Sequence, residues 1–217
     1  AGDLPSVQKS FFRNLVAAFF AAIILIKNHT APKVEKTQWG SLFLRCAFGT
    51  LGILCNFYAI DHLLVADASI LNKLSPFFAI IFSFLLLKER IKPAQAMCVI
   101  LAFVGCLFVV KPGFENAHLI PALIGVCGGL GAGIAYTMVR KMGTHGVKGP
   151  VIVFYFSCFS CIIVIPWIVF HYQPMSLRQL LTLLLAGLFA AGGQFTITAA
   201  YTLSLIHISE PTRQEAI

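Results

Sequence analysis

The chain has 217 residues, of which 59% are hydrophobic and only 11% are charged, and its mean hydropathy is +0.88. Soluble domains are typically about 45–50% apolar and about 25% charged, so this composition excludes a soluble globular enzyme. Sixteen Lys and Arg against eight Asp and Glu give a net charge of +8, but these basic residues lie between long apolar runs. That pattern is typical of membrane topology, so we expect a lipid bilayer and no nucleic acid as partner.

Seven apolar stretches are each long enough for a transmembrane helix, which needs about 20 mostly apolar residues. They predict spans at residues 10–27, 41–61, 66–87, 94–111, 119–139, 150–170 and 179–202. Proline and glycine agree with these limits, because Pro93 lies at the start of the fourth span and Gly149-Pro150 opens the sixth. The predicted fold class is all-α, a polytopic membrane helix bundle.

Basic residues gather in alternate loops. The loops after the first, third and fifth spans contain nine of them: Lys27, Lys33, Lys36, Lys88, Arg90, Lys92, Arg140, Lys141 and Lys148. The opposite side has four: Lys9, Arg13, Lys111 and Arg178. The positive-inside rule makes the first set cytoplasmic and places residue 1 outside, which predicts a multi-pass protein of the inner (cell) membrane.

A weak internal repeat relates two parts of the chain. A shift of 141 residues aligns residues 41–60 with 182–201 and gives five identities: Leu42 with Leu183, Leu44 with Leu185, Phe48 with Phe189, Gly52 with Gly193, and Ala59 with Ala200. The same shift maps the first basic loop onto the loop of Arg178, so the two copies have opposite orientations. We therefore expect two inverted sets of five helices, of which seven are present, with one helix before residue 1 and two beyond residue 217.

The last residues break the apolar pattern. From residue 203 the chain reads LSLIHISEPTR, which resembles the translation of a transposase adapter used in sequencing libraries. We expect residues 203–217 to be artefactual, the alternative being a natural short polar tail. Genomic sequence that continues through this tail in one reading frame would contradict an artefact.

Several short motifs resemble one transporter family. They are Ala66-Asp67-Ala68-Ser69, Leu74-Ser75-Pro76-Phe77-Phe78, Leu87-Lys88-Glu89-Arg90-Ile91, Gly105 before Lys111-Pro112-Gly113, and Phe11-Phe12-Arg13-Asn14. Together they resemble the first repeat of EamA-type proteins of the drug/metabolite transporter superfamily. The resemblance implies a ten-helix bundle of two inverted five-helix repeats with a central substrate cavity. Residues 1–113 would then be helices 2–5 of the first EamA repeat, and 119–202 would be helices 6–8, the start of the second.

Lys73 is the clearest candidate for function, because an ionisable side chain within a bilayer is costly. It lies about seven residues into its predicted span, roughly 10 Å below the outer surface. Asn56, on the preceding span, is predicted at the same depth. We interpret Lys73 as binding a carboxylate or phosphate of a substrate, or guarding a gate. The alternative is a structural cation that Asp61, Asp67 or Asn56 satisfies, or one that snorkels outward.

Other polar groups in the predicted spans join this candidate site. Asn72 follows Ser69 with helical spacing, and Pro76 cannot donate to the carbonyl of Asn72, which favours a kink beside the cavity. The full set of predicted substrate-binding residues is Lys73, Asn56, Asn72, Tyr58, Tyr136 and Gln194. Hydrogen bonding between neighbouring helices is the alternative role for the tyrosines and amides.

Two further patterns predict structural roles. Arg45 and Arg13 lie near span ends, which favours topology anchors that snorkel to the surface. Gly125, Gly129 and Gly133 form a double G-x-x-x-G that lets another backbone come close. It either seals the two halves or forms a dimer contact, and we favour the former, so a monomer and a homodimer both stay open.

The sequence contains no catalytic constellation. The seven cysteines all fall in apolar runs and read as small apolar side chains, and the Cys158-x-x-Cys161 pair lies mid-span, away from a redox context. No metal spacing, phosphate-binding loop or cofactor motif is present, so we expect no enzyme, cofactor or metal. The predicted function is a permease that moves a small metabolite by alternating access. The alternative is a non-transporting membrane protein, such as a sensor or an assembly partner.

Overall fold

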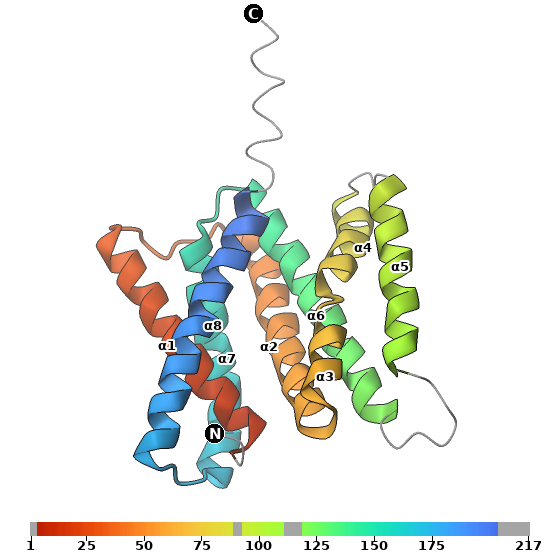
Figure 1. The fold of residues 1–217 in the computed structure, drawn as a ribbon. Coiled ribbons are helices and arrows are strands. Elements are labelled where there is room, and N and C mark those ends of the chain that lie inside the picture. The colour runs from red at the N-terminus through yellow and green to blue at the C-terminus, as the bar shows by residue number, and fades with distance from the viewer. Residues whose placement is uncertain (1–3, 89–92, 111–118, 204–217) are drawn as a thin grey trace, which may run out of the picture. The chain divides into compact units, whose positions relative to one another are not determined.

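The computed structural model describes residues 4–88, 93–110 and 119–203, and all regular secondary structure in these ranges is helical (Figure 1). The elements are α1 (Ser6–Lys27), the short 3-10 helix η1 (Lys36–Gln38), α2 (Trp39–His62), α3 (Val65–Asn72), α4 (Ser75–Leu87), α5 (Pro93–Val110), α6 (Leu119–Thr144), α7 (Gly149–His171) and α8 (Leu177–Leu203). Because backbone groups find no water in hydrocarbon, a helix that pairs them internally is the form expected of apolar spans. The all-α membrane fold is confirmed.

Six helical segments in the described ranges are long and apolar enough to cross a membrane: Ser6–Lys27, Lys36–His62, Val65–Leu87, Leu119–Thr144, Gly149–His171 and Leu177–Thr202. The fourth predicted span corresponds to α5, in which Ala96–Gly105 is a shorter apolar helix. The third predicted span is interrupted between α3 and α4. The tail beyond residue 203 lies outside the described residues.

The chain divides into two compact units, and unit 1 comprises residues 1–46 and 138–217. Within it α1 lies beside both α7 and α8 (Figure 1). Buried polar groups join α1 to α7: the Asn14 amide donates to Ser160 Oγ at 2.9 Å and to Ser10 Oγ at 3.4 Å. Such bonds are favourable where the alternative is an unsatisfied amide in hydrocarbon.

Hydrogen bonds of unit 1 also pair its loops. Lys148 Nζ donates to Thr30 Oγ1 at 3.1 Å, and Tyr155 Oη donates to the Pro32 carbonyl at 2.8 Å, so the loops after α1 and α6 share one end of the unit. At the beginning of α1, Gln8 Nε2 donates to the Gln173 carbonyl at 3.0 Å. The loop after α7 therefore meets the beginning of α1, which is the alternation that the basic residues predict. Which end is cytoplasmic stays a prediction.

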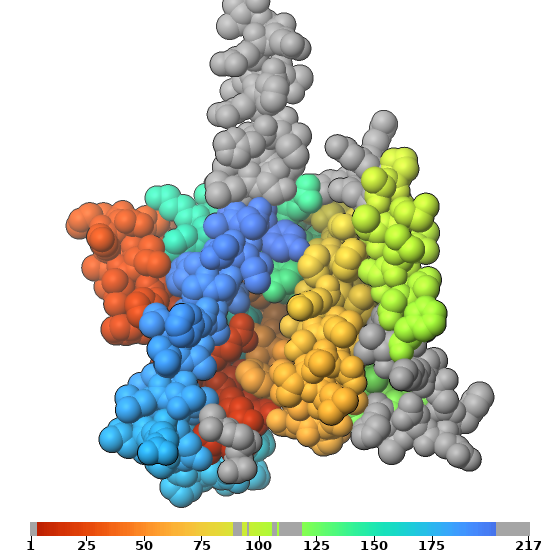
Figure 2. Space-filling model, in the orientation of Figure 1, coloured from red at the N-terminus to blue at the C-terminus, as the bar shows by residue number. Residues whose placement is uncertain are grey.

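The outer surface of unit 1 is apolar along α8. The space-filling view shows α8 on the face toward the viewer (Figure 2). Large apolar side chains on this helix are exposed, among them Leu181 at 58%, Leu185 at 55% and Phe189 at 72%. A surface of this kind is unfavourable in water and suits contact with lipid chains.

Unit 2 comprises residues 47–137, and its core lies where α3, α4, α5 and α6 meet. Leu71, Leu74, Phe78 and Ala122 are its buried centre, and the Phe78 ring meets Phe103 of α5 edge-on with centroids 5.1 Å apart. Edge-to-face contact of this kind adds roughly 0.5–1.5 kcal/mol beyond area burial.

The glycines of α6 provide the close packing of unit 2. A Cβ at Gly125 would lie 3.0 Å from Leu71 Cδ1 and 3.2 Å from Ala59 Cβ, and one at Gly129 would lie 2.9 Å from the Leu71 carbonyl oxygen. Helices α2 and α3 therefore contact the backbone of α6 directly, as small residues at membrane interfaces allow. These glycines thus pack helices of this chain against one another, whereas the sealing of two inverted halves stays a prediction.

Candidate substrate-binding site

The candidate site is built around the break between α3 and α4. Lys73 (φ −70°, ψ −4°) and Leu74 (φ −70°, ψ −15°) keep right-handed helical torsions, but the hydrogen bonding tightens here, because Leu74 N–H donates to the Leu71 carbonyl three residues back at 3.2 Å. Pro76 has no N–H to give to the carbonyl of Asn72, and its ring crowds that carbonyl. At the kink predicted from Pro76 the structure has a two-residue turn, which divides the apolar segment Val65–Leu87 into α3 and α4.

Lys73 occupies the end of α3 at this break. Its side chain is exposed, whereas its neighbours Leu71 and Leu74 are buried in the core of unit 2. A cation at a helix C-terminus is favourable because the last carbonyls carry partial negative charge. Across the described ranges, no hydrogen bond or ion pair of the Lys73 ammonium is observed, the pairing with Asp61 or Asp67 considered above included.

Helices α2 and α3 bring two of the predicted amides near one face of α6. The Asn56 backbone nitrogen lies 3.2 Å from a Cβ built at Gly128, one turn from Gly125, which Leu71 contacts. Asn72 follows Leu71 directly, and both Asn56 and Asn72 are half-buried. The break with Lys73 and the Asn56 segment of α2 thus pack against neighbouring turns of the same helix.

The other three predicted residues are Tyr58, Tyr136 and Gln194. Tyr58 is 40% exposed near the end of α2, where its ring stacks on His62 with centroids 4.1 Å apart. Tyr136 is half-buried near the end of α6 in unit 2. Gln194 belongs to unit 1, on α8, and its Nε2 is buried without a hydrogen-bond partner among the described residues.

Arg45 is the residue whose role the sequence mispredicts. It is not a snorkelling anchor: it is 2% exposed, and its guanidinium carbon lies 4.0 Å from the centroid of the Phe156 ring in α7. A cation over an aromatic face is attracted by the ring quadrupole, most strongly where water is excluded. Gln38 and Ser41 precede Arg45 with helical spacing and are also buried. This stripe of polar residues on one helix face was the feature of the sequence that could have predicted a buried Arg45.

Comparison with known proteins gives the following similarities. Residues 1–111 match the EamA-like transporter family. The pseudopaline exporter CntI of Pseudomonas aeruginosa is 32% identical over 98% of this chain and 74% of its own length. A riboflavin transporter of Brucella anthropi is 24% identical over 93% of this chain and 72% of its own. Human solute carrier family 35 member G1 is 26% identical over 91% of this chain and 58% of its own.

One solved crystal structure is similar in fold. It superposes with a TM-score of 0.70 over 93% of this chain and 71% of the other, at 14% sequence identity. This likeness concerns the arrangement of helices alone.

Proposed function

The chain belongs to the EamA-like transporter family, and on that premise we propose that it moves a small metabolite across the cell membrane by alternating access. The observation that carries the proposal is the interrupted helix at Lys73. Transporters place substrate at discontinuous helices, because the ends of the two halves present backbone groups that no helix satisfies. Relatives named for pseudopaline and for riboflavin support a small organic substrate.

The chemistry of the break suggests what such a substrate carries. The Lys73 ammonium is a donor for an anionic group, and the carbonyl of Asn72, to which Pro76 has no N–H to donate, is an acceptor for a substrate N–H or O–H group. The side chains of Asn56 and Asn72 add amides that both donate and accept. We therefore propose a polar metabolite that has both an acidic group and hydrogen-bond donors.

The repeat organisation remains part of the proposal. Residues 1–113 form the first EamA repeat and residues 119–202 the start of the second. Each compact unit contains helices of both proposed repeats, since unit 1 includes α1 as well as α7 and α8, and unit 2 includes α3 as well as most of α6.

Flux in reconstituted vesicles tests the proposal. Purified full-length protein, with the helices expected beyond both ends of this chain, is reconstituted in liposomes and offered riboflavin and pseudopaline, and accumulation is compared with that in protein-free vesicles. Lys73→Met should raise the KM roughly 10–100-fold, because a hydrogen bond to a charged group contributes about 1.5–3 kcal/mol. Lys73→Arg keeps the charge and should retain most of the flux.

Lys33→Met is the matched control, since Lys33 is an exposed loop lysine. Unchanged flux in Lys73→Met would refute the binding role of Lys73. Saturable binding of either compound without any flux would favour the sensor alternative. Folded protein that neither binds nor moves them would contradict the proposed substrate class.

A further inference from the structure

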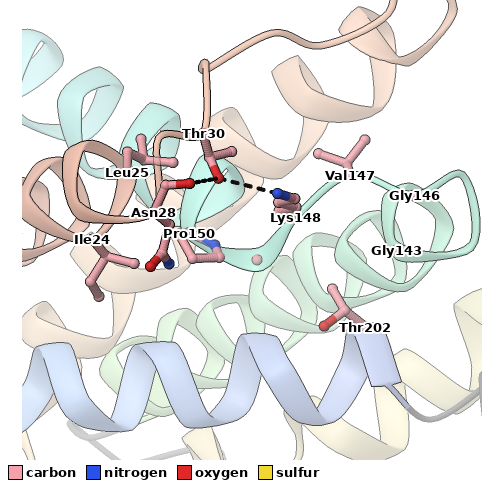
Figure 3. Close-up of a pocket in the computed structure, with 11 residues that line it drawn as sticks. Ile24, Leu25, Asn28, Thr30, Gly143, Gly146, Val147, Lys148, Pro150 and Thr202 are labelled. Atoms are coloured by element: carbon pink, nitrogen blue, oxygen red, sulfur yellow. Dashed lines mark hydrogen bonds between the residues drawn. The ribbon is translucent and has the colours of Figure 1, made fainter.

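Unit 1 contains a cavity of about 460 Å³ at the end where α1 and α6 finish and α7 begins (Figure 3). Its lining includes the apolar side chains of Ile24, Leu25 and Pro150. Among them Asn28, Thr30 and Lys148 supply an amide, a hydroxyl and an ammonium group. The cavity is therefore amphipathic, and its lining residues belong to unit 1, whereas Lys73 belongs to unit 2.

Two tight helix ends form this hollow. After α1, His29 has a positive φ of 46°, and Thr30 N–H donates to the Leu25 carbonyl at 2.9 Å. After α6, Gly146 has a φ of 79°, and Val147 N–H donates to the Met142 carbonyl at 3.1 Å. Left-handed caps of this kind satisfy the last carbonyls and turn the chain sharply away from the helix axis. The cavity wall is thus held by backbone bonds.

The end of α8 closes a further side of the cavity. A Cβ at Gly143 would lie 2.8 Å from Thr202 Cα, so the backbones of α6 and α8 are in direct contact there. The Thr202 hydroxyl is already bonded to the Thr198 carbonyl at 3.0 Å. Polar contacts with a ligand are therefore expected from Lys148 and not from Thr202.

Lys148 is positioned for an anion. Its Nζ donates to Thr30 Oγ1 at 3.1 Å, and Thr30 Oγ1 donates to the Asn28 carbonyl at 3.3 Å (Figure 3). An ammonium group has three donors, so this bond orients Lys148 and leaves donors for a ligand. Lys148 is also the N-cap residue of the 23-residue helix α7, whose first N–H groups favour negative charge.

The charge near the cavity is mostly positive. Residues 27–38 and 139–150, which surround the cavity, contain six Lys and Arg and a single acidic residue, Glu35. Basic pockets at the ends of membrane helices are a common kind of binding site for anionic lipid headgroups. Charge complementarity therefore selects an anionic occupant, and the apolar wall selects one with a hydrocarbon part.

We propose that this cavity binds the headgroup of an anionic phospholipid. The phosphate lies against the Lys148 ammonium and the Asn28 side-chain amide, and the Thr30 hydroxyl, which donates to the Asn28 carbonyl, holds Lys148 in place. The glycerol and first acyl carbons follow Ile24, Leu25 and Pro150. A free inorganic phosphate would use only the polar lining residues, and the apolar ones would remain hydrated. The proposal does not depend on transport, because it concerns a different unit and a different ligand.

Native mass spectrometry of the whole chain in detergent tests this proposal. The protein is titrated with phosphatidylglycerol or phosphatidylcholine of identical acyl chains, and the fraction with one lipid retained is measured. The unmodified chain should retain phosphatidylglycerol at lower concentration. Lys148→Gln should weaken that retention roughly fivefold, because each basic side chain near a membrane surface has an effect of about that size. Lys148→Arg should retain it.

Lys33→Gln removes the same charge from the same end of unit 1 at a position that does not line the cavity, so its lipid retention should be unchanged. Equal retention by Lys148→Gln and the unmodified chain would overturn the proposal. An equal loss in Lys33→Gln would also overturn it, since diffuse charge would then suffice. Displacement of the lipid by millimolar inorganic phosphate would show an anion site without lipid selectivity and would overturn the lipid assignment.

Discussion

Gly129 is a position where the packing of unit 2 leaves no room for a side chain. Its Cβ would lie 2.9 Å from the carbonyl oxygen of Leu71, and 3.7 Å from Cε2 of Phe78. The nearest atom belongs to the backbone of α3, so it cannot rotate away as a side chain would. Gly129→Ala must therefore push α3 away from α6 or strain one of the two helices.

The magnitude follows from two opposing terms. Alanine in a helix interior is more favourable than glycine by roughly 0.5–1 kcal/mol, and overpacking of a tight site costs about 1–3 kcal/mol. Gly193→Ala on α8 measures the helix-propensity gain alone, because nothing lies within 4 Å of a Cβ at Gly193. The difference between the two variants is then the overpacking cost, about 1–3 kcal/mol.

Unfolding in mixed detergent micelles measures this difference. The helicity of each variant is followed during titration with a denaturing detergent, and its free energy of unfolding is obtained from the transition. Gly193→Ala should be as stable as the unmodified chain or slightly more stable, and Gly129→Ala clearly less. If both variants unfold at the same denaturant fraction, the close approach of α3 to α6 is wrong. A normal Gly129→Ala fold that loses only a dimer would instead assign this glycine face to a contact between copies.

Three further substitutions test contacts of unit 1. Asn14→Ala removes the bond to Ser160 Oγ and should destabilise the protein by about 0.6–2 kcal/mol, with no further loss when Ser160→Ala is added; additive losses would contradict that bond. Arg45→Met and Phe156→Leu should couple by about 0.5–2 kcal/mol in a double-mutant cycle, and zero coupling would contradict the stacked geometry. Tyr155→Phe should cost about 0.5–1.5 kcal/mol of unfolding free energy, because its hydroxyl donates to a loop carbonyl; an unchanged value would exclude that bond.

The helices were predictable from the sequence because the bilayer permits few alternatives. An apolar run of about 20 residues has to pair its own backbone groups, and this constraint acts on each span separately. The break in the third span was also partly predictable. Pro76 affects the carbonyl four residues before it, which belongs to Asn72, and α3 ends at that residue.

The surroundings of single residues were not predictable in the same way. Counting from a span end gives the depth of Arg45 but not the direction in which it faces, and the ring that receives it belongs to α7. Pairings between distant helices depend on tertiary packing, which periodicity does not encode.

The glycine face and the helix break are mechanically linked. Before the break, Leu71 of α3 contacts Gly125 and Gly129, and after it Phe78 and Ala79 of α4 contact Gly133. The Thr137 hydroxyl is shared between the Gly133 carbonyl of its own helix at 3.0 Å and the Ala79 carbonyl of α4 at 3.3 Å. One helix, α6, therefore holds both halves of the broken span, and its packing sets the position of the residue between them. A methyl group at Gly129 should then impair flux even in the fraction of protein that folds, by displacing α3 relative to α4, whereas Gly193→Ala should leave flux unchanged. Equal flux from the folded fractions of both variants would mean that the break is positioned by its own local geometry and not by α6.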